Sequence, residues 1–318
     1  MMNSNRKKIL VALDGSSHSF DAVNYLSHML PRHDTSLVLF SVYSGRPERF
    51  RDIEESLFMD PKETGLEEWE NQQKKAIGEF MENSRQVFLD RGFPPDAVIL
   101  KIREKETGIA RDIIREAQSG YDAVVAGRQG MNPITRLVIG SVAAKLIASL
   151  TDVPLWLVGS CATDAAKILV ATDGSENALQ AVKYVGRMMS GSDVPITLFQ
   201  VIRGFDFRLP GPDAYFFKPP DGAAWPDESR EAHTVRAAFE KAVVALQAAG
   251  IDPVRITTKI VSGVATRSGT IIAQAMTGGY GTIVIGRKGH SRVGDFHMGR
   301  VTNKVVQLAG KAVVWVVS

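Results

Sequence analysis

KILVALDGS, at residues 8–16, recurs later in the chain as KILVATDGS, at residues 167–175. The offset between the two copies is 159 residues (167 − 8), and the same offset carries Gly127 onto Gly286. A repeat this long is typical of a duplicated domain, because the units of a solenoid are only 20–45 residues long. The sequence therefore predicts one fold, built twice.

Two domains are also what the length of 318 residues predicts, at roughly 100–200 residues per domain. The stretch from Gly159 to Asp164 is rich in small residues and reads as a linker. We therefore expect two units, residues 1–159 and residues 164–318.

Short strands rich in Val, Ile and Leu alternate with amphipathic helices in each copy. Copy one is predicted to hold strands at 9–13, 36–42, 97–102, 123–126 and 153–158. Those of copy two lie within 167–171 and at 196–201, 255–261, 282–285 and 312–317. Helices are expected near 66–91, 108–118, 228–249 and 268–276, and the last helix of each copy should begin at Gly140 or Gly299. Near-continuous apolar strands indicate a parallel sheet buried on both faces. The fold class is therefore α/β, with two repeated, doubly wound domains of five strands each.

The composition narrows the class of protein. Hydrophobic residues make up 44% and charged residues 23% of the chain, which is ordinary for a globular domain. A net charge of +3 gives no sign of a specific nucleic-acid partner. No apolar run reaches the roughly 18 residues of a membrane span, and no secretory signal is apparent. The one cysteine, Cys161, excludes an internal disulfide, so we expect a cytoplasmic protein.

Two glycine-containing loops carry the functional signal. The first is Gly127-Arg128-Gln129-Gly130 followed, nine residues on, by Gly140-Ser141; the second starts at Gly286 in the same pattern. Both loops begin where the fourth strand ends and finish where the last helix begins. A helix N-terminus offers free backbone N–H groups and the positive end of the helix dipole, which suit a phosphate. Glycine there lets the backbone approach an anion closely.

Asp14 and Asp173 end the first strand of each copy. Ligands of doubly wound sheets bind beyond the carboxyl ends of the strands, at the point where the strand order reverses. If the first and fourth strands are neighbours, the aspartate and the glycine loop face one crevice. Asp14-Gly15-Ser16 alone also fits ordinary turn and N-cap chemistry, but its recurrence together with the glycine pattern favours a binding role.

The pattern G-x2-G-x9-G-[S/T], with Asp-Gly-Ser after the first strand, resembles that of the universal stress protein family. The resemblance covers essentially the whole chain, twice. It implies the strand order 3-2-1-4-5 in each domain and pairing of the final strands, 153–158 against 312–317. It also implies ATP, with or without Mg, as the ligand. Trp156 and Trp315 are expected where those final strands meet.

Carried over by position, the resemblance assigns nucleotide contacts in both copies. Asp14 would contact the nucleoside and Val42 would meet adenine through its backbone. The remaining positions would line the ribose and phosphates, and those of copy one are Gly127, Gly130, Gly140, Ser141 and Val142. The positions in copy two are Asp173, Val201, Gly286, Gly289, Gly299, Arg300 and Val301. No residue is assigned to catalysis or to a metal.

Copy two departs from the pattern. Arg300 stands where copy one has Ser141, although Thr302 follows two residues later; in copy one the position of Thr302 is Ala143. The guanidinium of Arg300 could clamp phosphate bidentately, or it could fill the phosphate site and exclude the ligand. The sequence leaves both alternatives open.

Three functions compete. The first is an ATP-binding module for stress response or signalling. The second is a slow ATPase, but no P-loop and no paired base and nucleophile are apparent, so at most weak hydrolysis is expected. The third is a scaffold that works without nucleotide. We further expect an unidentified protein partner and an intramolecular pseudo-dimer of the two domains, with a further homodimer left open.

Overall fold

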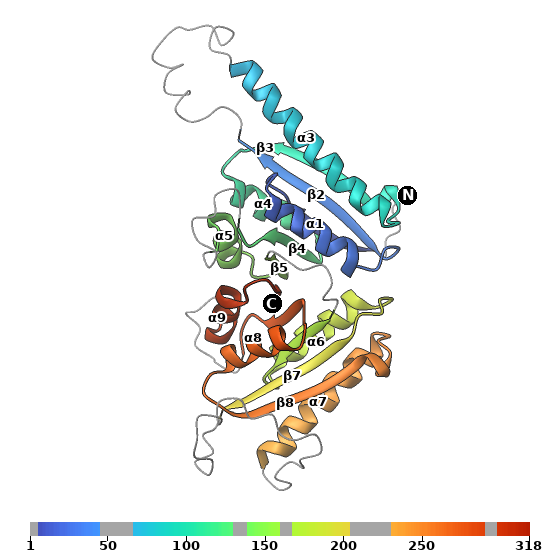
Figure 1. Cartoon of the computed structure of the whole chain (residues 1–318), viewed down its shortest axis with the longest axis vertical. Helices are drawn as coiled ribbons and strands as arrows, with labels where there is room; N and C mark the ends of the chain where they lie inside the picture. The colour runs from blue at the N-terminus through green and yellow to red at the C-terminus, as the bar shows by residue number, and fades with distance from the viewer. Residues whose placement is uncertain (1–5, 45–65, 130–138, 160–166, 204–229, 290–297) are drawn as a thin grey trace.

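The computed structural model describes residues 6–44, 66–129, 139–159, 167–203, 230–289 and 298–318 (Figure 1). The first repeat contains β1 (Lys7–Ala12), α1 (Ser17–Met29), β2 (Thr35–Tyr43), α3 (Leu66–Asp90), β3 (Val98–Glu104), α4 (Ile109–Ala117), β4 (Ala123–Gly127), α5 (Ser141–Ser149) and β5 (Leu155–Val158). The second contains β6 (Ile168–Thr172), α6 (Glu176–Met189), β7 (Ile196–Arg203), α7 (Arg230–Ala248), β8 (Ile256–Val264), α8 (Arg267–Thr277), β9 (Thr282–Gly286), α9 (Arg300–Leu308) and β10 (Val313–Val317). Single turns of 3-10 helix, Pro95–Ala97 and Pro253–Arg255, lead into β3 and β8.

All ten strands form one sheet in the order β3-β2-β1-β4-β5-β10-β9-β6-β7-β8. Each repeat therefore has the expected order 3-2-1-4-5, with parallel pairs throughout. The two halves meet where β5 and β10 pair antiparallel, with Trp156 opposite Trp315. The expected pairing of the final strands is thus confirmed, and it removes an exposed edge from each repeat.

The register of the sheet shows how closely the repeats correspond. Ile9 pairs with Leu37, and their counterparts 159 residues later, Ile168 and Ile196, pair in the same way. The third strand is the exception, because Leu37 pairs with Val98 but Ile196 pairs with Ile256, an offset of 158. The expectation of a constant offset was therefore wrong at β3 and β8, and it holds again at β4 and β9.

The sheet is buried on both faces, which explains its continuous apolar strands. One core lies under α1, α3, α6 and α7, and it runs through both repeats. The other core lies under α4, α5, α8 and α9. Successive residues of each strand point alternately into the two cores. In β1, Ile9 and Val11 belong to the first core and Leu10 belongs to the second. No helix in the described part of the chain has the length and apolarity that crossing a membrane requires.

Four aromatic side chains fill the seam between the repeats. The rings of Trp156 and Trp315 stack with centroids 3.7 Å apart and planes inclined by 5°. Each indole N–H donates to a tyrosine hydroxyl of the other repeat, Trp156 to Tyr184 and Trp315 to Tyr25, both at 3.0 Å. Both indole N–H groups and the two tyrosine hydroxyls are hydrogen-bonded. The burial of the two indoles therefore carries no uncompensated polar cost.

Candidate functional site

The turn after β1 is built around Asp14. Its Oδ1 accepts hydrogen bonds from the Ser16 backbone N–H (3.0 Å) and from Ser16 Oγ (2.6 Å). Gly15 takes a φ of +82°, a conformation that favours glycine. Ser16 then caps α1, since its Oγ accepts from the Ser19 N–H. The carboxylate therefore shapes the turn, and within the described residues its second oxygen, Oδ2, has no hydrogen-bond partner.

The turn after β6 repeats this construction. Asp173 Oδ1 accepts from the Ser175 N–H at 3.0 Å, Gly174 has a φ of +78°, and Ser175 Oγ caps α6 by accepting from the Ala178 N–H. The two aspartates thus occupy the same local geometry. Turn and N-cap chemistry is present at both positions.

The glycine that ends the fourth strand lies against the start of the first helix. A Cβ added at Gly127 would come within 3.0 Å of the Gln129 carbonyl oxygen and 3.4 Å of that of His18. At Gly286 the equivalent neighbours are the carbonyl oxygens of Lys288 and Asn177, both at 3.3 Å. Only glycine fits such a close approach without movement of the backbone. The glycine loop and the aspartate turn are therefore adjacent in both repeats, as the sequence predicted.

Gly289 lies close to the aspartate of its repeat. A Cβ added there would overlap Asp173 Oδ2, so the bare backbone of the glycine loop faces the outer carboxylate oxygen. Gly130, its counterpart in the first repeat, lies outside the described residues. The linker at 160–163 also lies outside them, so the division of the chain at 159 and 164 stays a prediction.

The valines assigned to adenine lie next to the aspartates. Ala12 pairs with Phe40, and continuing this parallel register by two residues places Val42 beside Asp14. In the second repeat Thr172 pairs with Gln200, so Val201 lies beside Asp173. Both valine side chains are buried, which leaves their backbone at the strand end as the part that a ligand could reach. From β1 the chain adds β2 and β3 on one side of the sheet and then β4 and β5 on the other, and β6 has the same place in the second repeat. The strand order thus reverses at β1 and β6, the position where doubly wound sheets bind ligands.

Each glycine loop is closed at its base by a hydrogen bond. The Gly140 N–H donates to the Arg128 carbonyl oxygen and the Gly299 N–H donates to that of Arg287, both at 2.8 Å. The loops thereby bring the start of the last helix back to the end of the fourth strand.

The helices that follow these loops begin without a side-chain cap. The N-cap residues are Gly140 for α5 and Gly299 for α9, whereas serine side chains cap α1 and α6. In α5 the first intrahelical bond runs from the Ala144 N–H to the Gly140 carbonyl, so residues 141–143 keep N–H groups without a helical partner. Such a helix start is suited to hold an anion.

Equivalent positions of the two helix starts have the same degree of exposure although their residues differ. Ser141 and Arg300 are both exposed, and Val142 and Val301 are half-buried against the core. Thr302 is buried, and its Oγ1 donates to the Gly286 carbonyl oxygen at 2.8 Å. The hydroxyl of Thr302 therefore closes the end of β9 onto α9, a bond that Ala143 cannot make in the first repeat.

Arg128 and Arg287 point away from the site. A basic side chain in such a loop is expected to lie near the phosphate or to be solvated, but neither holds for this pair. Arg128 is 7% exposed and Arg287 is 4% exposed, and each guanidinium donates to carbonyl groups of the other repeat. Burial lowers the pKa of Arg128 to about 10 and also lowers the pKa of Arg287.

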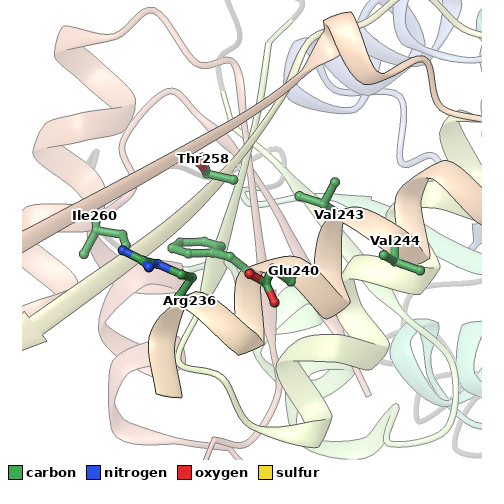
Figure 2. A pocket seen from close by; sticks show the side chains of 7 residues that line it. Arg236, Glu240, Val243, Val244, Thr258 and Ile260 are labelled. Carbon is green, nitrogen blue, oxygen red and sulfur yellow. The ribbon is translucent and has the colours of Figure 1, made fainter. Parts of the chain in front are cut away.

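A groove of about 430 Å³ lies elsewhere, between α7 and the edge strand β8 (Figure 2). Phe239 and Val243 of α7 line it opposite Thr258 and Ile260 of β8, and Arg236 reaches across toward Ile260. In the first repeat α3 packs onto β2 and β3, whereas α7 packs mainly against α6. The groove has neither the glycine loop nor the uncapped helix of the candidate site, so we do not place the nucleotide there.

Comparison with known proteins identifies the family to which the fold belongs. The sequence profile of the universal stress protein family matches residues 5–159 and again residues 165–317. A curated universal stress protein of Staphylococcus epidermidis is 26% identical over 141 residues, which cover 44% of this chain and 77% of that protein. The crystal structure of a universal stress protein from Archaeoglobus fulgidus covers 100% of this chain and 99% of its own, with 16% identity and a TM-score of 0.63.

One further similar structure is of a universal stress protein in complex with cAMP; it covers 48% of this chain and 96% of its own, with 20% identity and a TM-score of 0.36. The family profile spans nearly the whole chain in two copies, and the full-length structural match has the same fold. The chain is therefore a member of the universal stress protein family, with two copies of the family's domain in tandem.

Proposed function

We propose that each repeat binds ATP at the carboxyl edge of its strands, and that the tandem chain serves as a nucleotide-dependent stress-response or signalling module of the cytoplasm. The observation that carries the proposal is the convergence of three features in both repeats. The aspartate turn, the glycine at the end of the fourth strand and the uncapped start of the last helix meet at the point where the strand order reverses.

Each feature matches one part of the nucleotide. The free N–H groups of residues 141–143 and the hydroxyl of Ser141 are donors suited to phosphate oxygens. Oδ2 of Asp14 is an acceptor suited to ribose or adenine, and the end of β2 at Val42 offers backbone groups to the base. In the described residues no group of three His, Cys, Asp or Glu side chains could hold a metal. Magnesium would therefore arrive bound to the nucleotide, because the cation neutralises the charge of the phosphates.

The first experiment identifies the ligand. The purified full chain is denatured and any released nucleotide is identified by mass spectrometry; titration calorimetry then measures the affinity and stoichiometry for added ATP. Retention of ATP with negligible turnover supports the binding module. Steady turnover would replace the proposal with a slow ATPase, and a chain that neither carries nor binds adenine nucleotide would leave only the scaffold.

Asp14→Ala tests the site in the first repeat. Losing a charged hydrogen-bond acceptor should weaken ATP binding there about tenfold or more, because such bonds contribute roughly 1.5–3 kcal/mol. Ser16→Ala is the matched control, since it removes the cap of α1 and one hydrogen bond to Asp14 Oδ1 but keeps the carboxylate and its bond from the backbone N–H of residue 16. The control should lose about 1 kcal/mol of stability without a comparable loss of affinity. Equal affinity losses in the two variants would show that Asp14 acts only through the turn.

A further inference from the structure

Arg287 reaches from the glycine loop of the second repeat to the end of α5 in the first. Its Nη1 donates to the Ile147 carbonyl oxygen at 2.8 Å and its Nη2 donates to that of Leu150, the C-cap residue of α5. The last carbonyls of a helix have no intrahelical partner and carry the negative end of its dipole. Arg287 therefore caps α5 with both hydrogen bonds and charge.

Arg128 makes the reciprocal contact. From the glycine loop of the first repeat, its Nη1 donates to the Gly310 carbonyl oxygen (3.2 Å) and its Nη2 to that of Ala312 (2.9 Å). Both carbonyls belong to the turn that ends α9 and leads into β10. Nε of Arg128 is buried without a partner in the described residues, so this contact is the less complete of the two.

The helices that receive these arginines are the ones whose other ends form the candidate sites. α5 and α9 lie on the same face of the sheet, on either side of the β5–β10 seam (Figure 1). Each has nine residues, a rod of about 13 Å at 1.5 Å per residue. Arg287 holds one end of α5, and the other end of that helix begins at Ser141 in the site of the first repeat.

The backbone of each arginine belongs to its own site. The Arg287 carbonyl accepts from the Gly299 N–H at the start of α9, and the Arg287 N–H donates to the Val317 carbonyl. Arg128 makes the same two bonds, with Gly140 and Val158. A shift of the second glycine loop therefore moves a guanidinium, that of Arg287, which is hydrogen-bonded to the far end of α5. A shift of the first moves that of Arg128, which is hydrogen-bonded to the turn that follows α9.

We propose that Arg128 and Arg287 are positioning residues that couple the two nucleotide sites, each acting on the site of the other repeat through that repeat's last helix. The inference rests on the proposed function, because it concerns the same two sites. Its direction follows from charge. An arginine at the C-terminal end of a helix and a phosphate at the N-terminal end both favour the dipole, so loss of the arginine weakens phosphate binding at the far end.

The test measures the site in the first repeat while changing a residue of the second. A full chain carrying Asp173→Ala, with ATP binding to its second site weakened, is the parent, and Arg287→Met is added to it. Calorimetry should show ATP binding to the first site weakened roughly fivefold or more, in the range of ordinary coupling between sites. Arg287→Lys keeps the charge but loses the two-pronged contact, so it should fall between parent and Met variant.

Tyr184→Phe in the same parent is the control for damage to the seam. It removes the Tyr184 hydroxyl, which bridges the Trp156 indole and the Asp122 carbonyl, without touching α5. Thermal melting is recorded for every variant, and if the Met variant does not fold, the Lys variant decides.

The Met variant could melt at a lower temperature and still bind ATP at the first site as tightly as the parent. Arg287 would then be only a structural clamp, and the inference would be overturned while the proposed function stands. If neither the parent nor the wild-type chain binds ATP, the proposed function is overturned, and the inference is overturned with it.

Discussion

Asp14 and Asp173 order the turns in which they lie, and both belong to the proposed nucleotide sites. One carboxylate oxygen of each orders the turn, and in the second repeat the other oxygen faces the bare backbone of Gly289. The same geometry would arise from turn chemistry alone, so the aspartate by itself decides nothing. Its closeness to the glycine loop is what favours a ligand.

Gly289→Ala tests whether the glycine loop of the second repeat approaches the ligand. The added Cβ would overlap Asp173 Oδ2, so the carboxylate must turn away, and ATP binding to the second repeat should fall. The fold should persist because the displaced group is the end of a side chain. The measurement is calorimetry on a chain whose first site is weakened by Asp14→Ala.

Gly78→Ala is the matched control for that substitution. Gly78 lies within α3 and has open space where a Cβ would go, so alanine there should leave ATP binding unchanged and stabilise the helix by roughly 0.5–1 kcal/mol. If Gly289→Ala binds ATP as well as Gly78→Ala does, the glycine loop of the second repeat does not approach the ligand.

The arginines mark the limit of sequence reasoning about residues. Aspartate and glycine positions follow from strand ends, so their proximity could be predicted from the order of the strands. The direction of the Arg128 and Arg287 side chains could not, because it depends on carbonyl groups some 140 to 180 residues away in sequence. The one available signal was their occurrence at equivalent positions, immediately after the glycine of each loop.

Among the elements, α5 and α9 carry the difference between the repeats. Both start uncapped after a glycine, but one presents Ser141 and the other Arg300. The Arg300 side chain is exposed and, within the described residues, makes no hydrogen bond or ion pair. A positive charge in the first turn opposes the helix dipole unless an anion is bound there. We therefore favour the clamp over the plug.

Arg300→Ala should accordingly weaken ATP binding to the second repeat, and the affinity of the wild-type site should fall as salt rises. Arg300→Ser restores the residue of the first repeat and separates the alternatives, since a plug predicts stronger binding and a clamp predicts weaker binding. Lys304→Ala, an exposed lysine one turn further along α9, controls for loss of positive charge. Affinity unchanged by both Arg300 substitutions would make it a surface residue.

Strands and helices were predicted well where burial dominates. The ten strands follow from apolar runs that must lie between two layers of helices. The one-residue slip of β3 relative to β8 was not predicted, because edge strands such as these are half-exposed and their side chains constrain register weakly. The helical periodicity likewise did not predict that α3 and α7 pack against different neighbours.

The whole molecule is held together at the β5–β10 seam. Antiparallel pairing there converts two five-stranded sheets into one, and both cores run through it. The tandem arrangement makes this association intramolecular, at an effective concentration in the millimolar range for a short linker. The two candidate sites are thereby kept in a fixed relation, which their proposed coupling requires.

Trp156→Ala tests whether the seam supports both repeats. Trp156 is fully buried and stacked on Trp315, and its N–H bonds to Tyr184 of the other repeat. Removing it should cost about 3–5 kcal/mol in the free energy of unfolding. Because the lost contacts join the repeats, urea unfolding followed by circular dichroism should change from one transition to two.

Trp69→Ala is the control, since Trp69 on α3 is 36% exposed and its loss should cost far less. A single transition retained in Trp156→Ala, with a small loss of stability, would mean that the repeats fold independently of the seam and that contact between them is incidental to the stability of each.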